Sequence, residues 1–164
     1  MTDTPRFTIT RAFAAPRARV WDAWTRPEAL AQWFGPKGTC GTILAFDLRP
    51  GGEWRGRMDM PDGTAMYSKF VFREIAPMSR LVWVHGFADS EGNRIRAPFA
   101  AQFPLEMLTV VHFSEEGEGT RVELSWTPLD ATPEEEAFFV GMMASMNGGW
   151  SGSFDQLDEF LAGG

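Results

Sequence analysis

The sequence has very few residues that form covalent or metal cross-links. Its 164 residues include one cysteine, Cys40, and two histidines, His85 and His112. A single cysteine excludes an intramolecular disulfide and a multi-cysteine metal site. A histidine metal site needs several ligands gathered in one place, and the two histidines lie in different predicted strands. We therefore expect no metal centre and no bound cofactor.

Basic residues and long apolar runs are also scarce. The chain has 15 Lys and Arg against 22 Asp and Glu, for a formal net charge of −7. Because nucleic-acid affinity comes mainly from Lys and Arg, this balance argues against a nucleic-acid partner. No apolar run approaches the roughly 20 residues that span a bilayer, and residues 1–10 lack the pattern of a secretory signal. We expect a cytoplasmic protein with no membrane partner.

Aromatic and methionine side chains are abundant instead. The chain has 7 Trp, 14 Phe and 9 Met residues, which predicts a large aromatic interior. A length of 164 residues suits one domain, and no repeat or long linker divides the chain. We expect a single domain over residues 1–164, with its core from about residue 7 to residue 162.

One strand and two short helices are predicted at the start of the chain. Residues 7–13 alternate between apolar and polar side chains, as a half-buried strand does. Residues 16–34 carry two helical patterns. Thr25–Glu28 matches the T-x-x-E capping box, which would begin the second helix. Gly35–Pro36 is predicted to end it.

Residues 39–128 change to a period of two, which predicts about six antiparallel strands. Short turn signals separate most of them. The exception is residues 88–104, a polar, proline-bearing connection, and connections of that length are often functional lids. The sequence leaves open whether this segment forms a lid or a dimer contact, and whether the protein is a monomer or a homodimer.

The C-terminal residues predict one helix of about 30 residues. A second capping box at Thr132–Glu135 begins it. Large apolar side chains then recur every three or four residues from Phe139 to Leu161, and this phase continues through NGGWSGS at residues 147–153. The glycine-rich stretch is therefore interpreted as helical.

Glycine inside a helix needs a reason, because it costs about 1 kcal/mol relative to alanine. We expect Gly148, Gly149 and Gly152 to let the helix bend or approach the sheet closely. The same stretch nearly matches the G-x-S-x-G nucleophile elbow, but it has Ser153 where a glycine is required. It also lacks the preceding strand and a following histidine, so a hydrolase triad is not expected.

The two histidines give the only credible acid–base chemistry. His85 and His112 could face one cavity together with Glu106, which shares strand parity with His112. The simpler interpretation is two histidines hydrogen-bonded at a sheet face. The residues alone favour neither an empty nor a filled interior, although methionine and aromatic side chains often line promiscuous binding surfaces.

Five segments resemble the Activator of Hsp90 ATPase homologue 1-like (AHSA1-like) domain of the START/Bet v 1-like SRPBCC superfamily. They are VWDAWTRPEALAQWFGPKG, FDLRPGGEW, PDGTAMYSKFVFREIAPMSRLVW, FPLEMLTVVHFSEEGEGTRVELSW and SMNGGWSGSFDQLDEFLA. The resemblance implies an α+β helix-grip fold: a seven-stranded curved antiparallel sheet, two short helices and a long C-terminal helix, in the order β-α-α-β-β-β-β-β-β-α. It also implies a hydrophobic cavity between sheet and helix.

The resemblance implies less about the activity of the protein than about its fold. The family often has a second Trp where this chain has Phe34. The separate N-terminal domain of eukaryotic Hsp90 activators has no counterpart in the sequence, so ATPase activation does not follow. The family has no shared catalytic motif, and we assign no catalytic residue. Relatives of the self-sacrificing enediyne resistance proteins belong to it, which implies a role related to stress or resistance.

The leading functional hypothesis is non-enzymatic binding of a small hydrophobic or aromatic molecule, which requires a pocket of about 300 Å³ or more. Two alternatives stay open. One is a polyketide cyclase or dehydratase with His85 or His112 as general base. The other is a chaperone-associated module, an Hsp90-type cofactor that uses an exposed apolar patch. The expected ligand-binding residues are Trp33, Phe34, Trp54, Met58, Trp83, Met142, Met146 and Trp150, with Tyr67 and His85 as polar anchors.

Overall fold

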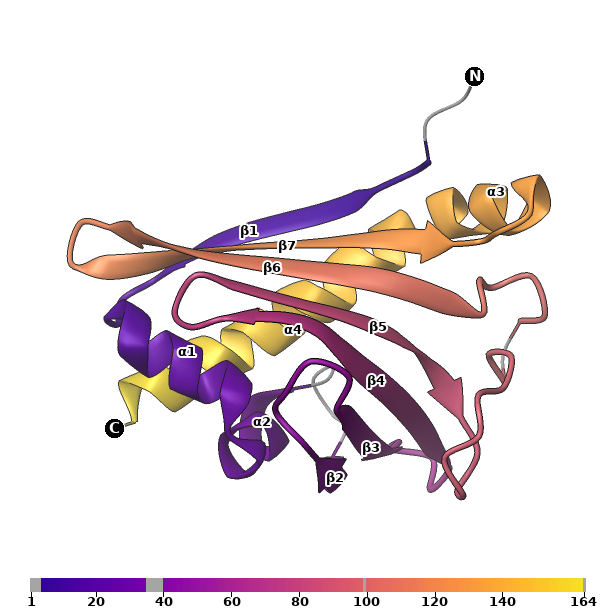
Figure 1. Cartoon of the computed structure of the whole chain (residues 1–164), viewed down its shortest axis with the longest axis horizontal. Helices are drawn as coiled ribbons and strands as arrows, with labels where there is room; N and C mark the ends of the chain where they lie inside the picture. Colours follow the sequence, from indigo (N-terminus) through magenta and orange to yellow (C-terminus); the bar gives the residue numbers. More distant parts are fainter. Residues whose placement is uncertain (1–3, 35–39, 99, 164) are drawn as a thin grey trace.

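The computed structural model describes residues 4–34, 40–98 and 100–163. Within them, seven strands form one antiparallel sheet in the order β1-β7-β6-β5-β4-β3-β2 (Figure 1). The strands are β1 (Phe7–Phe13), β2 (Cys40–Phe46), β3 (Glu53–Asp59), β4 (Ala65–Ala76), β5 (Arg80–Ala88), β6 (Glu106–Glu116) and β7 (Gly119–Leu129).

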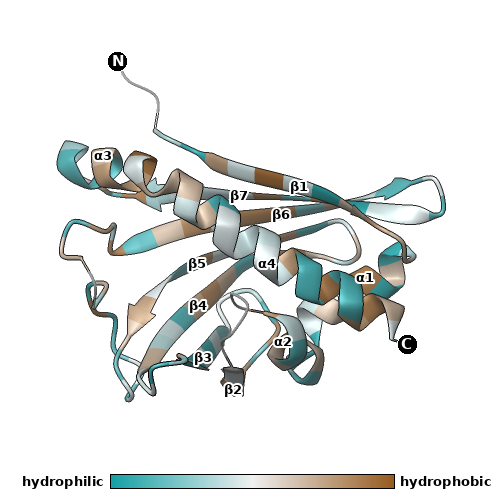
Figure 2. Cartoon of the chain, turned by 180° about the vertical axis from the view of Figure 1, so that it is seen from behind, coloured by the Kyte–Doolittle hydropathy of each residue, from teal (hydrophilic) through white to brown (hydrophobic). Residues whose placement is uncertain are grey.

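The helices of the described residues gather on one face of this sheet. They are α1 (Arg17–Thr25), α2 (Pro27–Trp33), α3 (Pro133–Gly141) and α4 (Met143–Ala162). Helix α4 runs diagonally across the sheet, and α1 and α2 lie near its C-terminal end (Figures 1 and 2). This arrangement confirms the predicted α+β helix-grip fold. No helix of the described chain is both long and apolar enough to cross a membrane.

The face of the sheet toward α4 is apolar because successive side chains of a strand point to opposite faces. Strand β6 shows the rule: Val111 and Phe113 are buried, whereas His112 between them is exposed. From the other side, Phe154 and Leu157 of α4 are fully buried against the sheet. Full burial of one large apolar side chain contributes roughly 1.5–3 kcal/mol, so this layer is the main source of stability.

The start of α2 differs from the prediction. Thr25 is the last residue of α1, and its hydroxyl donates to the Trp21 carbonyl 2.8 Å away instead of capping α2. The residue before a proline is pushed out of the helical region, so Arg26 is extended and α2 begins at Pro27. The expected capping box at Thr25–Glu28 was therefore wrong. The predicted stop at Gly35–Pro36 lies outside the described residues.

The C-terminal segment is two helices, not the single one expected. The capping box at Thr132 is confirmed, because its hydroxyl accepts from Glu135 N and the Glu135 carboxylate accepts from Thr132 N. Helix α3 then ends at Gly141, and α4 starts after Met142. The Met142 amide donates to the carbonyls of both Phe138 and Phe139, which tightens the turn and separates the two helices.

Gly148 and Gly149 of α4 do not serve a close approach to the sheet. A Cβ atom added at Gly148 or Gly149 would meet nothing within 4 Å. The expected close approach was therefore wrong for both residues. Open space beside Gly149 has another origin, because this residue borders the cavity described below.

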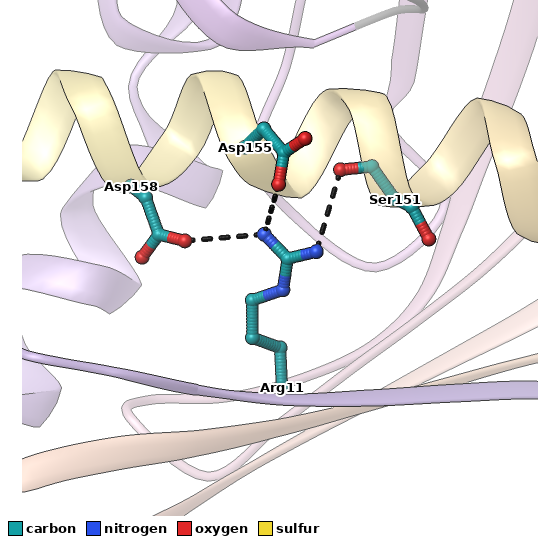
Figure 3. Close-up of polar contacts among 4 residues, drawn as sticks. All are labelled: Arg11, Ser151, Asp155 and Asp158. Atoms are coloured by element: carbon teal, nitrogen blue, oxygen red, sulfur yellow. Dashed lines mark hydrogen bonds and ion pairs between the residues drawn. The ribbon is translucent and has the colours of Figure 1, made fainter.

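An arginine of the edge strand β1 binds α4 (Figure 3). Arg11 lies 2.7 Å from the Asp155 carboxylate and 3.1 Å from that of Asp158. Its guanidinium also lies 5.7 Å from the centre of the Phe154 ring. One strand side chain therefore contacts two successive turns of the helix and joins β1 to α4.

The segment between β5 and β6 packs against the end of the sheet and against α3. Arg96 pairs with the Glu135 carboxylate and lies near the Phe103 carbonyl. The buried Phe103 ring contacts Phe87 at 6.0 Å and Phe138 at 6.3 Å between centroids. The segment therefore covers one end of the interior, and its Phe103 packs on Phe87 of β5, which lines the cavity described below.

Candidate functional site

A cavity of about 250 Å³ lies between the sheet and α4. Its wall on the sheet side comes from β3, β4, β5 and β7, its wall on the helix side comes from α4, and the end of α2 closes it. Its lining is almost wholly apolar. The lining residues are Phe34, Met58, Met66, Ser68, Phe70, Phe87, Trp126, Met146, Gly149, Trp150 and Ser153.

Aromatic rings form the rigid part of the wall. Trp150 of α4 contacts Phe34 at 5.5 Å and Trp126 at 5.8 Å between ring centroids, both edge to face. Phe34 in turn meets Phe70 at 6.0 Å, again edge to face. Such pairs are worth about 0.5–1.5 kcal/mol beyond their buried area. The four rings therefore hold one another in place around the cavity.

Methionines line the softer side of the cavity. Met58 and Met66 are directly opposite each other in the β3–β4 pairing, and Met146 faces them from α4. Met58 and Met66 are half-buried, as are several other lining residues, so the cavity is not closed off from the surface. Unbranched thioether side chains adapt their shape readily, which suits the entrance of a binding site.

Four of the ten predicted binding residues line the cavity: Phe34, Met58, Met146 and Trp150. Three others form the layer behind it. Trp54 stacks on Phe70 with centroids 4.0 Å apart, and Trp83 meets Phe70 edge to face at 5.9 Å. Trp33 is fixed by a 2.8 Å hydrogen bond from its indole N–H to the Ala23 carbonyl. Trp33 and Trp83 support the wall without belonging to it, whereas Trp54 also lines a small pocket that adjoins the cavity.

The structure does not place Tyr67 and Met142 at the cavity. Tyr67 has the opposite strand parity from Ser68 and Phe70, which are lining residues. Its ring lies under the Arg57 guanidinium, 6.0 Å away, on the outer face of the sheet. Met142 is the residue between α3 and α4, where it packs on the core but stays outside the lining. Both expectations were therefore wrong in position.

His85 is buried behind the cavity wall. Its ring stacks on Phe70 at 5.4 Å and lies 4.9 Å from Trp126, both lining residues. Its Nδ1 is 3.0 Å from the Thr109 hydroxyl. Burial, with a smaller effect from the nearby positive charge of Arg94, lowers the pKa of His85 to about 3. The imidazole is therefore neutral and held in place at physiological pH.

The two histidines do not share a cavity. His112 is exposed on the outer face of β6, where it is paired in register with Arg80 and Glu123. Glu106 forms an ion pair with Arg94 at 3.1 Å. The expectation that His85, His112 and Glu106 could meet was wrong, because the alternation along the strands sends the histidines to opposite faces. In the described chain, no three His, Cys, Asp or Glu side chains are grouped to hold a metal.

Two other hollows lie near the cavity or on the surface. A small pocket of about 40 Å³ shares Phe34, Met58, Ser68 and Phe70 with the cavity and extends it toward α2. A surface cleft of about 590 Å³ lies between α1, α2 and the end of α4. Its residue Arg19 donates to the Leu161 carbonyl at 2.6 Å, which closes the last turn of α4. This larger cleft is lined by both charged and apolar residues, and its two arginines have structural partners, since Arg26 pairs with Asp22 at 3.7 Å.

A family model described as Activator of Hsp90 ATPase homolog 1-like protein matches residues 14–162. The chain belongs to this family. Similar solved structures include the protein Ms6760 from Mycobacterium smegmatis, with 28% identity over 98% of this chain and 96% of that one and a TM-score of 0.78. Another is NE0264 from Nitrosomonas europaea, with 27% identity over 99% and 97% and a TM-score of 0.75.

More distant likeness supports the fold alone. The AHSA1 protein SPO3351 from Silicibacter pomeroyi is 19% identical, over 96% of this chain and 98% of that one, with a TM-score of 0.73. A comparison with curated proteins finds no significant match. The AHSA1-like family and the SRPBCC helix-grip fold that the resemblance implied are thus confirmed.

Sequence reasoning missed seven lining residues of this AHSA1-like protein, and a signal existed for each. On α4, Gly149 and Ser153 lie three and seven positions after Met146, on the same helical face. On the strands, the others have the same parity as buried residues of their own strand. They are Met66, Ser68 and Phe70 of β4, Phe87 of β5 and Trp126 of β7.

Proposed function

We propose that this AHSA1-like protein binds a small, largely apolar aromatic molecule without transforming it. The observation that carries the proposal is the apolar cavity of about 250 Å³ between the sheet and α4. It is slightly smaller than the 300 Å³ at the lower end of common ligand pockets. The adjoining 40 Å³ pocket enlarges it toward that limit. A compact ligand follows from these volumes.

The cavity wall favours binding over catalysis. A general base must reach its proton directly or through one water. Neither histidine is among the described lining residues, and His85 is already engaged with Thr109. A cyclase or dehydratase that uses either imidazole is therefore less well supported than a binding protein.

A chaperone-associated role has weaker support in the structure. The large exposed apolar residues Leu44, Leu48, Met78, Leu105 and Val140 belong to separate strands, turns and helices. A docking surface would need such residues to be contiguous. The family name suggests a direct test of this alternative. Addition of the protein to a purified Hsp90-type chaperone should leave the ATPase rate of the chaperone unchanged. A role in stress or resistance would be decided by the identity of the ligand.

The test uses methionine methyl groups as reporters of binding. Native mass spectrometry of the purified protein is expected to show a small co-purified molecule or, after its removal, uptake of indole or naphthalene. In NMR spectra of protein with ¹³C-methyl methionine, ligand should shift the signals of Met58, Met66 and Met146. Met78, exposed in the β4–β5 turn, is the internal control. Binding that shifts Met78 alone, or no uptake of any apolar compound, would refute the proposal.

A further inference from the structure

The size of the cavity limits the ligand to about two fused rings. A cavity of about 150 Å³ in another protein holds benzene, which has six carbon atoms. By the same ratio, a volume of about 250 Å³ holds roughly ten non-hydrogen atoms. A long acyl chain or a four-ring skeleton would not be enclosed completely without opening the rigid ring cluster of Phe34, Phe70, Trp126 and Trp150.

The charge of the lining excludes anionic ligands. The described lining contains no Lys, Arg or His. His85 behind the wall is neutral because its pKa lies far below 7. Arg57 borders only the adjoining small pocket, and its guanidinium is paired with Asp59 at 2.9 Å. A carboxylate in the cavity would therefore be desolvated without a cationic partner, which is strongly unfavourable.

Two hydroxyl groups interrupt the apolar lining from opposite walls. Ser68 belongs to β4 on the sheet side, and Ser153 belongs to α4 on the helix side. Ser153 is only 3% exposed. Buried hydroxyl groups normally have hydrogen-bond partners, and a hydroxyl both donates and accepts. A polar group on a bound ligand would give the buried Ser153 hydroxyl a partner inside the cavity, and the half-buried Ser68 lines the cavity from the opposite wall.

From these three observations we infer that the cavity selects a neutral bicyclic arene that carries one hydroxyl or carbonyl group, and that Ser68 and Ser153 recognise this group. The aromatic rings and methionines bind the ring system through its faces and edges. The serines set the orientation and discriminate the substituted arene from the bare hydrocarbon. This inference rests on the proposed binding function and adds the ligand class and the residues that determine specificity.

The experiment compares three compounds that share one bicyclic ring system by calorimetry at pH 7.5: naphthalene, 2-naphthol and 2-naphthoate. 2-Naphthol should bind about fivefold tighter than naphthalene, because one neutral hydrogen bond contributes about 1 kcal/mol net. 2-Naphthoate should bind at least about 100-fold more weakly than 2-naphthol, since its charge must be desolvated. Ser68→Ala and Ser153→Ala should each reduce the preference for 2-naphthol and leave naphthalene affinity unchanged.

Ser145→Ala is the matched control, because Ser145 is also on α4 but is exposed. Thermal unfolding of each variant verifies that it folds. If none of the three compounds binds, the proposed function itself fails. If naphthalene binds as tightly as 2-naphthol, or 2-naphthoate binds best, the cavity is a binding site but the inferred selectivity is overturned. If both serine variants keep the full preference for 2-naphthol, the role of the serines is overturned.

Discussion

Substitutions at Gly148 and Gly149 test directly how the cavity affects the stability of the fold. They are neighbours in α4, and a Cβ atom at either position would meet nothing within 4 Å. They differ in surroundings: Gly148 is exposed, whereas Gly149 lines the cavity. A pair of identical substitutions at these two sites therefore separates the helix propensity of the side chain from its effect on the cavity.

The magnitude follows from helix propensity and volume. Glycine is about 1 kcal/mol less favourable than alanine in a helix, and leucine is close to alanine. Leucine at either position should therefore stabilise the fold by up to about 1 kcal/mol. At about 25 Å³ for each carbon atom, as benzene in its cavity gives, the four side-chain carbons introduced by Gly149→Leu would fill about 100 Å³ of the 250 Å³. Space for only one ring would remain.

The assay combines urea unfolding with calorimetric titration of naphthalene. Gly148→Leu should raise the free energy of unfolding and leave naphthalene affinity within about twofold. Gly149→Leu should raise it by at least as much and abolish measurable naphthalene binding. If Gly149→Leu binds naphthalene as the parent protein does, the cavity is not the binding site. If it destabilises the fold by more than about 1 kcal/mol, Gly149 has a packing role after all.

Three further perturbations have defined outcomes. The pKa of His85 is about 3 in the folded protein, below its ordinary value of 6.5. As the pH falls, the unfolded chain therefore binds a proton at this site before the folded protein does. The stability that the neutral imidazole contributes is complete above pH 6.5 and is lost between pH 6.5 and 3. His85→Asn should flatten urea-unfolding stability across that window, by up to about 5 kcal/mol at pH 3, and an unchanged pH dependence in this variant would contradict the burial of a neutral imidazole. Thr132→Ala should cost about 1 kcal/mol in urea unfolding through loss of the α3 cap, and an unchanged midpoint would contradict that bond. Arg11→Met should speed amide exchange in β1 and α4 and cost about 1 kcal/mol, and a loss confined to other strands would contradict the role of this ion pair.

Strand alternation predicted the sheet well because a period of two directly reports which face of a strand is covered. It did not predict the depth of a side chain within that face. Trp54 and Trp83 point to the correct side, yet each is 1% exposed behind Phe70 and so lies outside the cavity. Depth depends on how rings from different strands stack, and a single strand pattern carries no information on that.

Local features explain why Tyr67 was wrongly predicted to bind the ligand and why the helix break at Met142 was not predicted. Tyr67 was chosen for its hydroxyl, although the neighbouring Ser68 shares the parity of the buried Phe70 and Phe72. Met142 keeps a right-handed helical conformation, with φ −95° and ψ −1°. A single residue of this kind bends the chain without shifting the hydrophobic phase, so the spacing from Phe139 onward could not reveal two helices.

The cavity exists because small residues interrupt one stripe of large ones. Met146, Gly149, Trp150 and Ser153 occupy one face of α4, at spacings typical of a buried helical stripe. Leucine at positions 149 and 153 would make this stripe an ordinary core. The facing wall cannot move inward to compensate, because Trp126 is fixed by its ring contact with Trp150 and Phe70 by its ring contact with Phe34. The chain keeps glycine at position 149 at a cost of about 1 kcal/mol, and it thereby keeps a space that the rigid aromatic wall preserves.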